Sequence, residues 1–183
     1  MASGETIQGI KRVDLQNRGP WRRRMWWVLG GPIVTSKTGL NVWRTVGAPV
    51  EARIITATRG RVKLSVNLPM VVLTSIGARS GQRREVPLGY FTDGDDVILI
   101  ASNYGGAKHP GWYHNLRRHP ECALSIGPRG GPFVAREAVG ADRDRLYALA
   151  VDRLNHVFAL HDRRSGPART IPVMRLTPAD PDR

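Results

Sequence analysis

The sequence predicts an α+β fold, an antiparallel, barrel-like sheet of about six strands with covering helices. Three observations lead to this prediction. Strand-like apolar runs recur from Met70 onward, an Asp-Gly turn at 93–94 joins two of them as a hairpin, and one long amphipathic segment near the C-terminus can cover the sheet. The β-α-β alternation and the GxGxxG motif of a Rossmann domain are absent from the sequence.

The expected strands are short and are separated by turn-forming residues. They are Met70–Ser75, Glu85–Phe91, Val97–Ala101, Glu121–Ile126, Phe133–Val139 and Thr170–Leu176. The first hairpin turns at 92–95, and a Gly/Pro-rich loop, GPRGGP at 127–132, is expected to join the second.

Two helices are expected between these strands. The first is His109–His119, with Pro110 at its start and Pro120 as its stop. The second is a single long amphipathic helix, Asp142–His161, because apolar residues recur at helical spacing along it.

The N-terminal third is expected to differ from the barrel. Residues 1–19 are polar with little periodicity and are predicted to form a mobile arm. Trp21–Leu29 combines tryptophans and arginines; it is either a helix packed on the core or a second subunit, or an interfacial element on anionic lipid. A short helix at 35–46 and a strand pair or link at 50–67 follow. We therefore divide the chain into 1–67, possible membrane- or dimer-associated elements, and 68–178, a barrel domain.

Composition narrows the function classes. The chain has 183 residues, a formal net charge of +13 and one cysteine, Cys122, which excludes an internal disulfide and fits a cytoplasmic protein. The charge could serve nucleic acid, an anionic membrane surface or an anionic cofactor. Nucleic acid is the least favoured because the arginines are spread along the chain and no zinc-finger, KH or RNP pattern is present.

The sequence does not indicate acid–base, nucleophilic or metal chemistry by the protein itself. No His/Asp/Ser arrangement has suitable spacing, and the histidines lack the partners that a zinc site needs. Asp93, Asp95 and Asp96 are interpreted as turn residues. What remains is a binding scaffold without a catalytic side chain or a metal.

Three segments of that scaffold have polar or glycine-rich character. Arg79 and Arg84 flank Ser80-Gly81-Gln82 in a turn and offer forked donors to an anion; a solvated turn is the plain alternative. Ser102-Asn103 and Gly105-Gly106 follow a strand and allow close approach of a ligand, or form a connecting loop. Trp112 and Asn115 share a helix face and could bind a ligand together; the alternative is that Trp112 packs in the core and Asn115 caps a backbone group.

Taken together, GARSGQRREVPL at 77–88, ASNYGGAKHPGWYHNL at 101–116 and ARTIPVMRL at 168–176 resemble the deazaflavin (F420)-dependent nitroreductase family. The resemblance covers about residues 68–176. It implies a split β-barrel related to flavin-binding oxidoreductases of actinobacterial type. It also implies coenzyme F420, a deazaflavin with a phosphate and a polyglutamate tail, whose reduced form delivers a hydride to an acceptor.

The resemblance also implies roles for individual residues. The phosphate and acidic tail would be held by the turn, Arg79, Ser80, Gly81, Gln82 and Arg84. The ring would be lined by Pro87 and Leu88, contacted by Ser102 and Asn103, and approached closely at Gly105 and Gly106. The site would be completed by Lys108, Trp112, Tyr113 and Asn115. Asn103 stands where the family often has Lys, so one positive contact is missing, with Lys108 nearby.

The acceptor is expected to be small and hydrophobic: a quinone, an activated alkene or a nitroaromatic. Nitroimidazole-activating members carry several tyrosines on the late helix, whereas here that stretch offers His156 and Phe158, with His161 beyond them. Efficient nitroimidazole reduction is therefore not expected. The protein is expected to be a monomer or homodimer, with or without peripheral attachment to the membrane. Two alternatives remain open: a split-barrel oxidoreductase that uses flavin mononucleotide, and a non-catalytic protein that binds F420 or anionic lipid.

Overall fold

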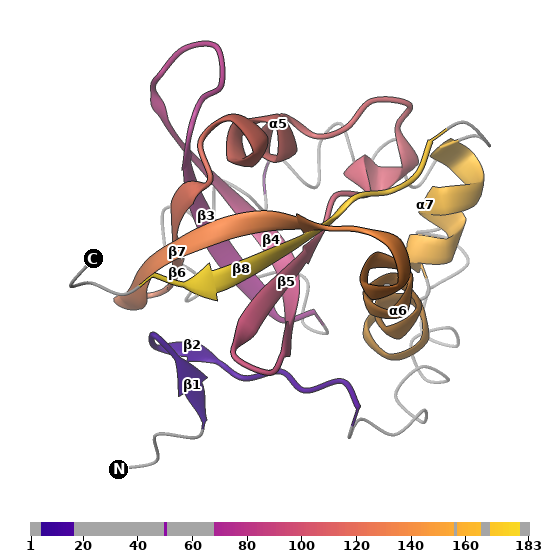
Figure 1. The fold of residues 1–183 in the computed structure, drawn as a ribbon, viewed down its shortest axis with the longest axis horizontal. Coiled ribbons are helices and arrows are strands. Elements are labelled where there is room, and N and C mark those ends of the chain that lie inside the picture. Colours follow the sequence, from indigo (N-terminus) through magenta and orange to yellow (C-terminus); the bar gives the residue numbers. More distant parts are fainter. Residues whose placement is uncertain (1–4, 17–49, 51–67, 156, 166–168, 180–183) are drawn as a thin grey trace.

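The computed structural model describes residues 5–16, 50, 68–155, 157–165 and 169–179. A closed barrel forms its centre, with the strand order β3-β4-β5-β8-β7-β6 and every neighbouring pair antiparallel. The strands are β3 (Met70–Ile76), β4 (Arg83–Asp93), β5 (Asp96–Ile100), β6 (Glu121–Ile126), β7 (Arg129–Ala138) and β8 (Val173–Pro178). Figure 1 shows α5 (Gly111–Arg118) over one edge of this barrel and α6 and α7 at its side. The predicted six-stranded antiparallel barrel with covering helices is confirmed.

Apolar side chains from all six strands fill the barrel. Six that share the inward-facing register, one from each strand and each at most 2% exposed, are Leu73, Tyr90, Leu99, Leu124, Phe133 and Leu176. Burial of this kind contributes roughly 25 cal/mol for each Å² removed from water. The core therefore holds the strand ends, and the loops that leave them, in fixed positions.

The glycine-rich segment 127–132 is mostly strand, so its prediction as a loop is wrong. A two-residue turn suffices, and β7 begins directly after it. The glycines allow close contact instead of breaking the strand: a Cβ on Gly130 would lie 2.2 Å from the Leu124 carbonyl oxygen, and one on Gly131 would lie 1.9 Å from Gln8 Oε1.

Residues 5–16 form a small hairpin on the barrel, so the prediction of a mobile arm is wrong for this segment. Strands β1 (Thr6–Ile7) and β2 (Ile10–Lys11) are joined through Gln8 and Gly9, which have φ of 47° and 79° as a two-residue hairpin turn requires. The apolar residues that this short sequence offers are all buried: Ile7, Ile10, Val13 and Leu15.

Backbone and side-chain hydrogen bonds attach this hairpin segment to the barrel. Val13 N donates to Thr92 Oγ1 at 2.9 Å, and Thr92 N donates to the Val13 carbonyl at 3.0 Å. Gln8 Nε2 donates to the Ala179 carbonyl at 2.8 Å. Figure 1 shows the hairpin beside the barrel end at which β4 turns into β5.

The predicted single helix Asp142–His161 is wrong, because the chain breaks in its middle. Helix α6 (Gly140–Leu149) continues as a π-helical turn, Ala150–Leu154, and a new helix, α7 (Val157–Ser165), follows. Asn155 is extended, with φ −160° and ψ 110°. Its N–H bonds to the Ala150 carbonyl at 2.9 Å and its carbonyl accepts from Phe158 N at 3.1 Å. One residue thus ends the first helix and starts the second.

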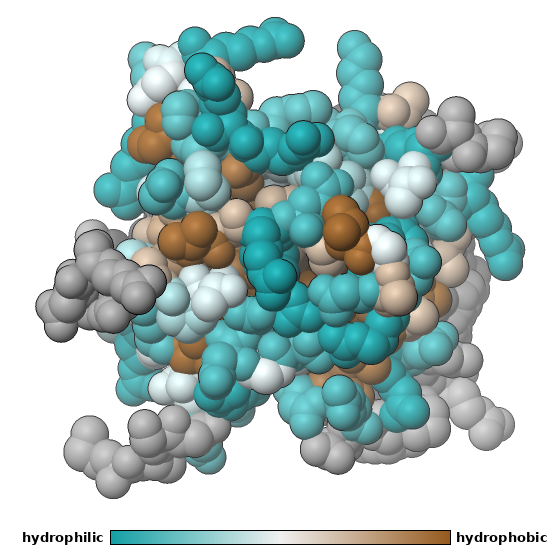
Figure 2. Space-filling view, in the orientation of Figure 1, coloured by the Kyte–Doolittle hydropathy of each residue, from teal (hydrophilic) through white to brown (hydrophobic). Residues whose placement is uncertain are grey.

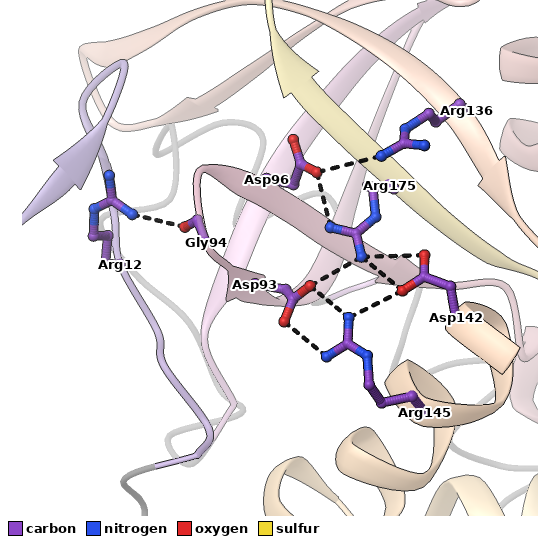
Figure 3. Close-up of polar contacts among 8 residues, drawn as sticks. All are labelled: Arg12, Asp93, Gly94, Asp96, Arg136, Asp142, Arg145 and Arg175. Atoms are coloured by element: carbon purple, nitrogen blue, oxygen red, sulfur yellow. Dashed lines mark hydrogen bonds and ion pairs between the residues drawn. The ribbon is translucent and has the colours of Figure 1, made fainter.

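An ion-pair network joins β4, β5, β8 and α6 (Figure 3). The buried Arg175 guanidinium on β8 contacts Asp96 at 2.8 Å and both Asp93 and Asp142 at 2.9 Å. Arg145 bonds to the Asp93 carboxylate through two nitrogens, at 3.0 and 2.8 Å. Hydrogen bonds from Arg145, followed by those from Arg175, outweigh desolvation and lower the pKa of Asp93.

This network corrects the interpretation of two aspartates. Asp93 and Asp96 end β4 and start β5, but they also fix the helix and the last strand to that hairpin. Asp95 does remain at the exposed turn, where Arg12 from the N-terminal segment reaches its carboxylate and the Gly94 carbonyl.

Several predicted elements lie outside the described residues. They are the Trp21–Leu29 segment, the helix at 35–46 and, except for residue 50, the strand pair or link at 50–67. The division of the chain at residues 67 and 68 therefore stays a prediction. Among the residues that the structure describes, no helix has both the length and the apolar character needed to cross a membrane.

Candidate cofactor site

The basic turn between β3 and β4 is closed by its own backbone. Gly77 N donates to the Gln82 carbonyl at 2.8 Å, and Gly81 N donates to the Gly77 carbonyl at 2.9 Å. Gly81 has φ +64°, a left-handed conformation that suits glycine. The five residues predicted to hold the anionic part of a cofactor are all exposed on it: Arg79, Ser80, Gly81, Gln82 and Arg84.

The three arginines of this turn are not equivalent. Arg83 pairs with Glu85 at 2.9 Å. Arg84 Nη2 donates to Gln82 Oε1 at 3.2 Å and makes no ion pair within the described part of the chain; nor does Arg79. Figure 2 shows hydrophilic side chains projecting at the corner where Figure 1 places this turn. Arg79 and Arg84 therefore present positive charge to solvent that no described carboxylate neutralises.

Helix α5 is hydrogen-bonded to the basic turn through Asn115. Asn115 Oδ1 accepts a hydrogen bond from Ala78 N at 2.9 Å, and Asn115 Nδ2 donates to Ser75 Oγ at 3.3 Å. Trp112 and Tyr113 are 8% and 5% exposed and pack in the core. The contacts of these three predicted cofactor ligands are thus with the protein itself, and direct contact with a cofactor stays a prediction for them.

Tyr113 and its neighbours link α5 to the preceding loop and to β7. The Tyr113 hydroxyl donates to Glu137 at 3.0 Å and accepts from Arg117 at 3.4 Å. Burial raises the pKa of Tyr113. The His109 ring lies 4.9 Å from the Tyr113 ring, centroid to centroid.

The loop between β5 and α5 has a left-handed backbone. Asn103, Tyr104 and Gly105 follow one another with φ of 49°, 53° and 75°. Ser102 before them is 7% exposed, and Asn103 Nδ2 donates to the Lys108 carbonyl at 2.8 Å. The Asn103 amide is therefore engaged within the loop, while Lys108 is exposed.

Arg169 fixes this loop, and the sequence analysis did not single it out. Its Nη1 donates to the Ser102 carbonyl at 3.2 Å and to the Gly106 carbonyl, and its Nη2 donates to the Ala101 carbonyl at 2.9 Å. Its Nε donates to His109 Nδ1 at 3.3 Å. Burial, followed by the Arg169 charge, lowers the pKa of His109, which suits an imidazole nitrogen that accepts. The one available signal was the position of Arg169 inside the motif ARTIPVMRL.

His161 on α7 reaches the same loop. It is 5% exposed, and its Nδ1 lies 3.1 Å from Ser102 Oγ. The rings of Tyr104 and Phe158 stand edge-on to it at 6.1 and 6.0 Å. Phe158, a predicted acceptor contact, is half-buried, and its carbonyl accepts from the Tyr147 hydroxyl at 2.9 Å. His156, the other predicted acceptor contact, lies outside the described residues.

Pro87 and Leu88 lie on β4 and are half-buried. Pro87 pairs with Val72 of β3, and β5 joins β4 only from Tyr90 onward. A proline is tolerated here because its missing N–H faces no second strand. Both residues lie three or four positions beyond Arg84 on the same strand, roughly 10–13 Å at about 3.3 Å per residue.

The fold brings most of the predicted residues to one edge of the barrel. The Ala78–Asn115 bond joins the basic turn to α5, and the His109–Tyr113 contact joins α5 to the left-handed loop. Figure 1 shows these three segments along the edge of the barrel that lies away from the N-terminal hairpin. Within the described ranges, no group of three or more His, Cys, Asp or Glu could hold a metal ion. Burial raises the pKa of Cys122 to about 12, which disfavours the thiolate form that a nucleophilic cysteine needs.

Comparison with known proteins defines the class. A family model described as "F420H(2)-dependent quinone reductase" matches residues 50–178. The F420H(2)-dependent quinone reductase Rv1261c of Mycobacterium tuberculosis is 31% identical over 126 residues, which are 68% of this chain and 85% of that protein.

Two solved structures agree with this match. One, titled "Structure of F420-H2 Dependent Reductase (FDR-A)", is 32% identical with a TM-score of 0.51 and covers 59% of this chain and 93% of its own. Another, described as a domain-swapped dimer, is 31% identical with a TM-score of 0.54. The match covers 68% of this chain and 91% of that one.

The chain belongs to the F420H(2)-dependent quinone reductase family. It is a split-barrel oxidoreductase, and its cofactor is coenzyme F420. The resemblance seen in the sequence is thereby confirmed at the level of family, fold and cofactor.

Proposed function

We propose that this protein transfers a hydride from reduced F420 to a quinone at the edge formed by the basic turn, the left-handed loop and α5. The observation that carries the proposal is the pair of arginines, Arg79 and Arg84, exposed without a carboxylate partner in the described structure. They lie at the edge where the Arg169-fixed loop is also found.

The donor set fits the cofactor that the family uses. F420 carries a phosphate and several carboxylates, and a guanidinium fork binds such groups through two parallel hydrogen bonds. Arg79 and Arg84 would hold these anions together with Ser80 and Gln82. Arg83 would contribute less because Glu85 already neutralises it.

The remaining predicted residues would position the ring. When bound, the reduced deazaflavin supplies the hydride. Pro87 and Leu88 would provide an apolar surface that excludes water, and the Ser102 hydroxyl would donate to or accept from a polar ring atom. Gly105 and Gly106 would allow the backbone to come close. The protein itself then supplies orientation and electrostatics, which agrees with the absence of a recognisable catalytic triad.

A quinone is the acceptor that the family description supports. Activated alkenes and nitroaromatics remain proposals of lower rank, and oxidation of reduced F420 in the presence of each acceptor class tests them. Their reduction in the absence of any reaction with quinones would contradict the proposed acceptor class.

Titration of the protein with F420, followed by cofactor fluorescence at low and moderate salt, tests the site. We expect Arg79→Ala/Arg84→Ala to weaken binding at least about tenfold, since each charge-assisted bond contributes roughly 1.5–3 kcal/mol. Salt should also weaken binding by the unmodified protein. Arg83→Ala is the matched control, in the same turn and with the same charge change, and should alter binding by less than about threefold.

Unchanged affinity in the double variant would show that the anionic tail binds elsewhere. A protein that binds flavin mononucleotide and not F420 would instead support the alternative flavin-dependent oxidoreductase.

We further propose that Trp21–Leu29 places the protein on an anionic membrane surface, where lipophilic quinones are concentrated. Its mixture of tryptophan and arginine supports this proposal. Flotation with vesicles that contain anionic lipid, with and without residues 1–34, provides the test. Binding that persists after truncation, or that is absent from the full chain, would refute it.

A further inference from the structure

Tyr104 has a backbone conformation that its side chain disfavours. It has φ 53° and follows Asn103, at φ 49°, in the same left-handed region. Asparagine tolerates this region well, but a tyrosine there is unusual because its Cβ approaches the following carbonyl. Glycine would adopt this backbone without strain.

The surrounding contacts force this conformation on Tyr104. Gly105 N donates to the Ser102 carbonyl at 3.0 Å, and Gly106 N donates to the Asn103 carbonyl at 2.9 Å. Arg169 binds carbonyls on both sides of the tyrosine, at Ser102 and at Gly106. Strained residues that are determined by so many neighbours are found mainly at functional sites.

The conformation places the Tyr104 ring beside His161, which contacts Ser102, a residue predicted to contact the cofactor ring. Tyr104 is 41% exposed, although its aromatic neighbour His161 is 5% exposed. The two rings meet edge to face at 6.1 Å, and His161 in turn bonds to the Ser102 hydroxyl at 3.1 Å. The Phe158 ring also stands edge-on to the His161 ring, with the centroids 6.0 Å apart. Tyr104 is the exposed member of this row of three rings.

We propose that Tyr104 is a specificity-determining residue that binds the flat ring of the quinone acceptor by stacking; this inference rests on the function proposed above. A quinone ring is planar and electron-poor, whereas a phenol ring is electron-rich, so the two attract each other in an offset stack. Arg169 and the left-handed loop act as positioning groups that hold the phenol ring in place. Fused-ring quinones should profit more than single-ring quinones because they offer a larger stacking area.

Three variants separate the ring from the backbone. Tyr104→Gly removes both the ring and the strain, Tyr104→Leu removes the ring but keeps the Cβ, and Tyr104→Phe keeps the ring. The measurements are the melting temperature, the dissociation constant for F420, and the KM for 2-methyl-1,4-naphthoquinone in the presence of reduced F420. Equilibrium dialysis of the same quinone against the protein with oxidised F420 gives a binding constant without turnover.

For Tyr104→Gly we expect an equal or higher melting temperature and F420 binding within about twofold, because strain is released. Its KM and dissociation constant for the quinone should rise about tenfold, as loss of an aromatic stack implies. Tyr104→Leu should show the same loss, and Tyr104→Phe should stay within about twofold of the unmodified protein.

Quinone binding that is unchanged in both Tyr104→Gly and Tyr104→Leu would overturn the proposal. So would a loss of melting temperature and F420 affinity in Tyr104→Gly, since the residue would then be structural. A failure of the unmodified protein to oxidise reduced F420 with any quinone would refute the proposed function instead. Dialysis would still decide the role of Tyr104 in that case.

Discussion

Arg169 shows how a single side chain can fix a binding loop. Its guanidinium bonds to three backbone carbonyls and to His109 Nδ1, which uses the planar fork of donors that only arginine has. Burial lowers its pKa, yet an arginine stays charged at any physiological pH. The loop that carries Ser102 and Tyr104 therefore depends on this residue.

Arg169→Lys should loosen the loop although the charge is kept. An ammonium group cannot reach three carbonyls and an imidazole at once, so we expect a loss of about 2 kcal/mol in the free energy of unfolding and weaker F420 binding. Urea unfolding and F420 titration measure the two effects. Arg163→Lys, on the exposed face of α7, is the control and should change neither. Equal behaviour of the two variants would contradict the role given to Arg169.

At this scale the sequence predicted some roles better than others. The exposed arginines of the basic turn lie where their flanking glycines and serine indicated. For Asn115, backbone capping was the alternative to a cofactor contact, and its amide does bond to Ala78 N and to Ser75 Oγ. Its contact with a cofactor stays a prediction. Arg169 and His161 bond to partners about 60 residues away in the sequence, so their contacts with the Ser102 loop could not be predicted from local patterns.

Among the elements, the β6–β7 hairpin depends most clearly on glycine. The strands approach so closely that a Cβ on Gly130 would meet backbone atoms of Leu124 and Ser125 at 2.2 and 2.8 Å. Backbone atoms in a closed barrel cannot move away without breaking pairs with the neighbouring strands.

Gly130→Ala should therefore destabilise the barrel by more than about 3 kcal/mol, as overpacking with backbone shifts implies. Gly111→Ala is the matched control, since a Cβ at the start of α5 meets nothing within 4 Å. It should be neutral or stabilising by up to about 1 kcal/mol. Urea denaturation compares the two, and a small effect at Gly130 would show that the hairpin is looser than described.

Sequence patterns predicted the strands well and the connections less well. The Asp-Gly turn and the apolar runs located the β4–β5 hairpin, although β4 extends two residues beyond the predicted strand at each end. Helical periodicity continued through Asn155, so the break into α6 and α7 was invisible: a π-helical turn shifts the register without interrupting the apolar spacing. The N-terminal hairpin is too short for a periodicity signal, and its burial depends on the barrel that it covers.

Across the whole molecule, the two ends of the barrel differ in charge: one holds carboxylates paired with arginines, and the other presents arginines to solvent. The end near the N-terminal hairpin holds Asp93, Asp96 and Asp142 in the network with Arg145 and Arg175 (Figure 3). The other end presents Arg79 and Arg84 to solvent. Because the protein has a net charge of +13, it attracts an anionic cofactor over a distance. Salt screens this attraction and shortens its range.

The ion network predicts a loss of stability in acid. The pKa of Asp93 is lowered in the folded state, so its contribution is complete above the unfolded value of about 4 and is lost as the pH falls through the folded value. We expect the free energy of unfolding to be steady in this respect from pH 5 to 8 and to fall below about pH 4.

Arg145→Ala should lower stability by about 1 kcal/mol at pH 6 and make the decline below pH 4 shallower. Arg136→Ala, whose exposed side chain lies 3.9 Å from Asp96, is the control with little expected effect. Urea unfolding at pH 6, 4 and 3 provides the comparison. An unchanged acid decline in Arg145→Ala would show that other carboxylates dominate it.

Anaerobic oxidation of reduced F420 by 2-methyl-1,4-naphthoquinone, followed by the return of oxidised F420, tests the central claim most directly. The account predicts that the unmodified protein accelerates the reaction in proportion to its concentration. Arg79→Ala/Arg84→Ala should raise the KM for reduced F420 at least about tenfold with little change in kcat, because these residues bind the tail and do not act in hydride transfer. A rate that does not depend on the protein, or a KM for reduced F420 that the double variant leaves unchanged, would contradict the account.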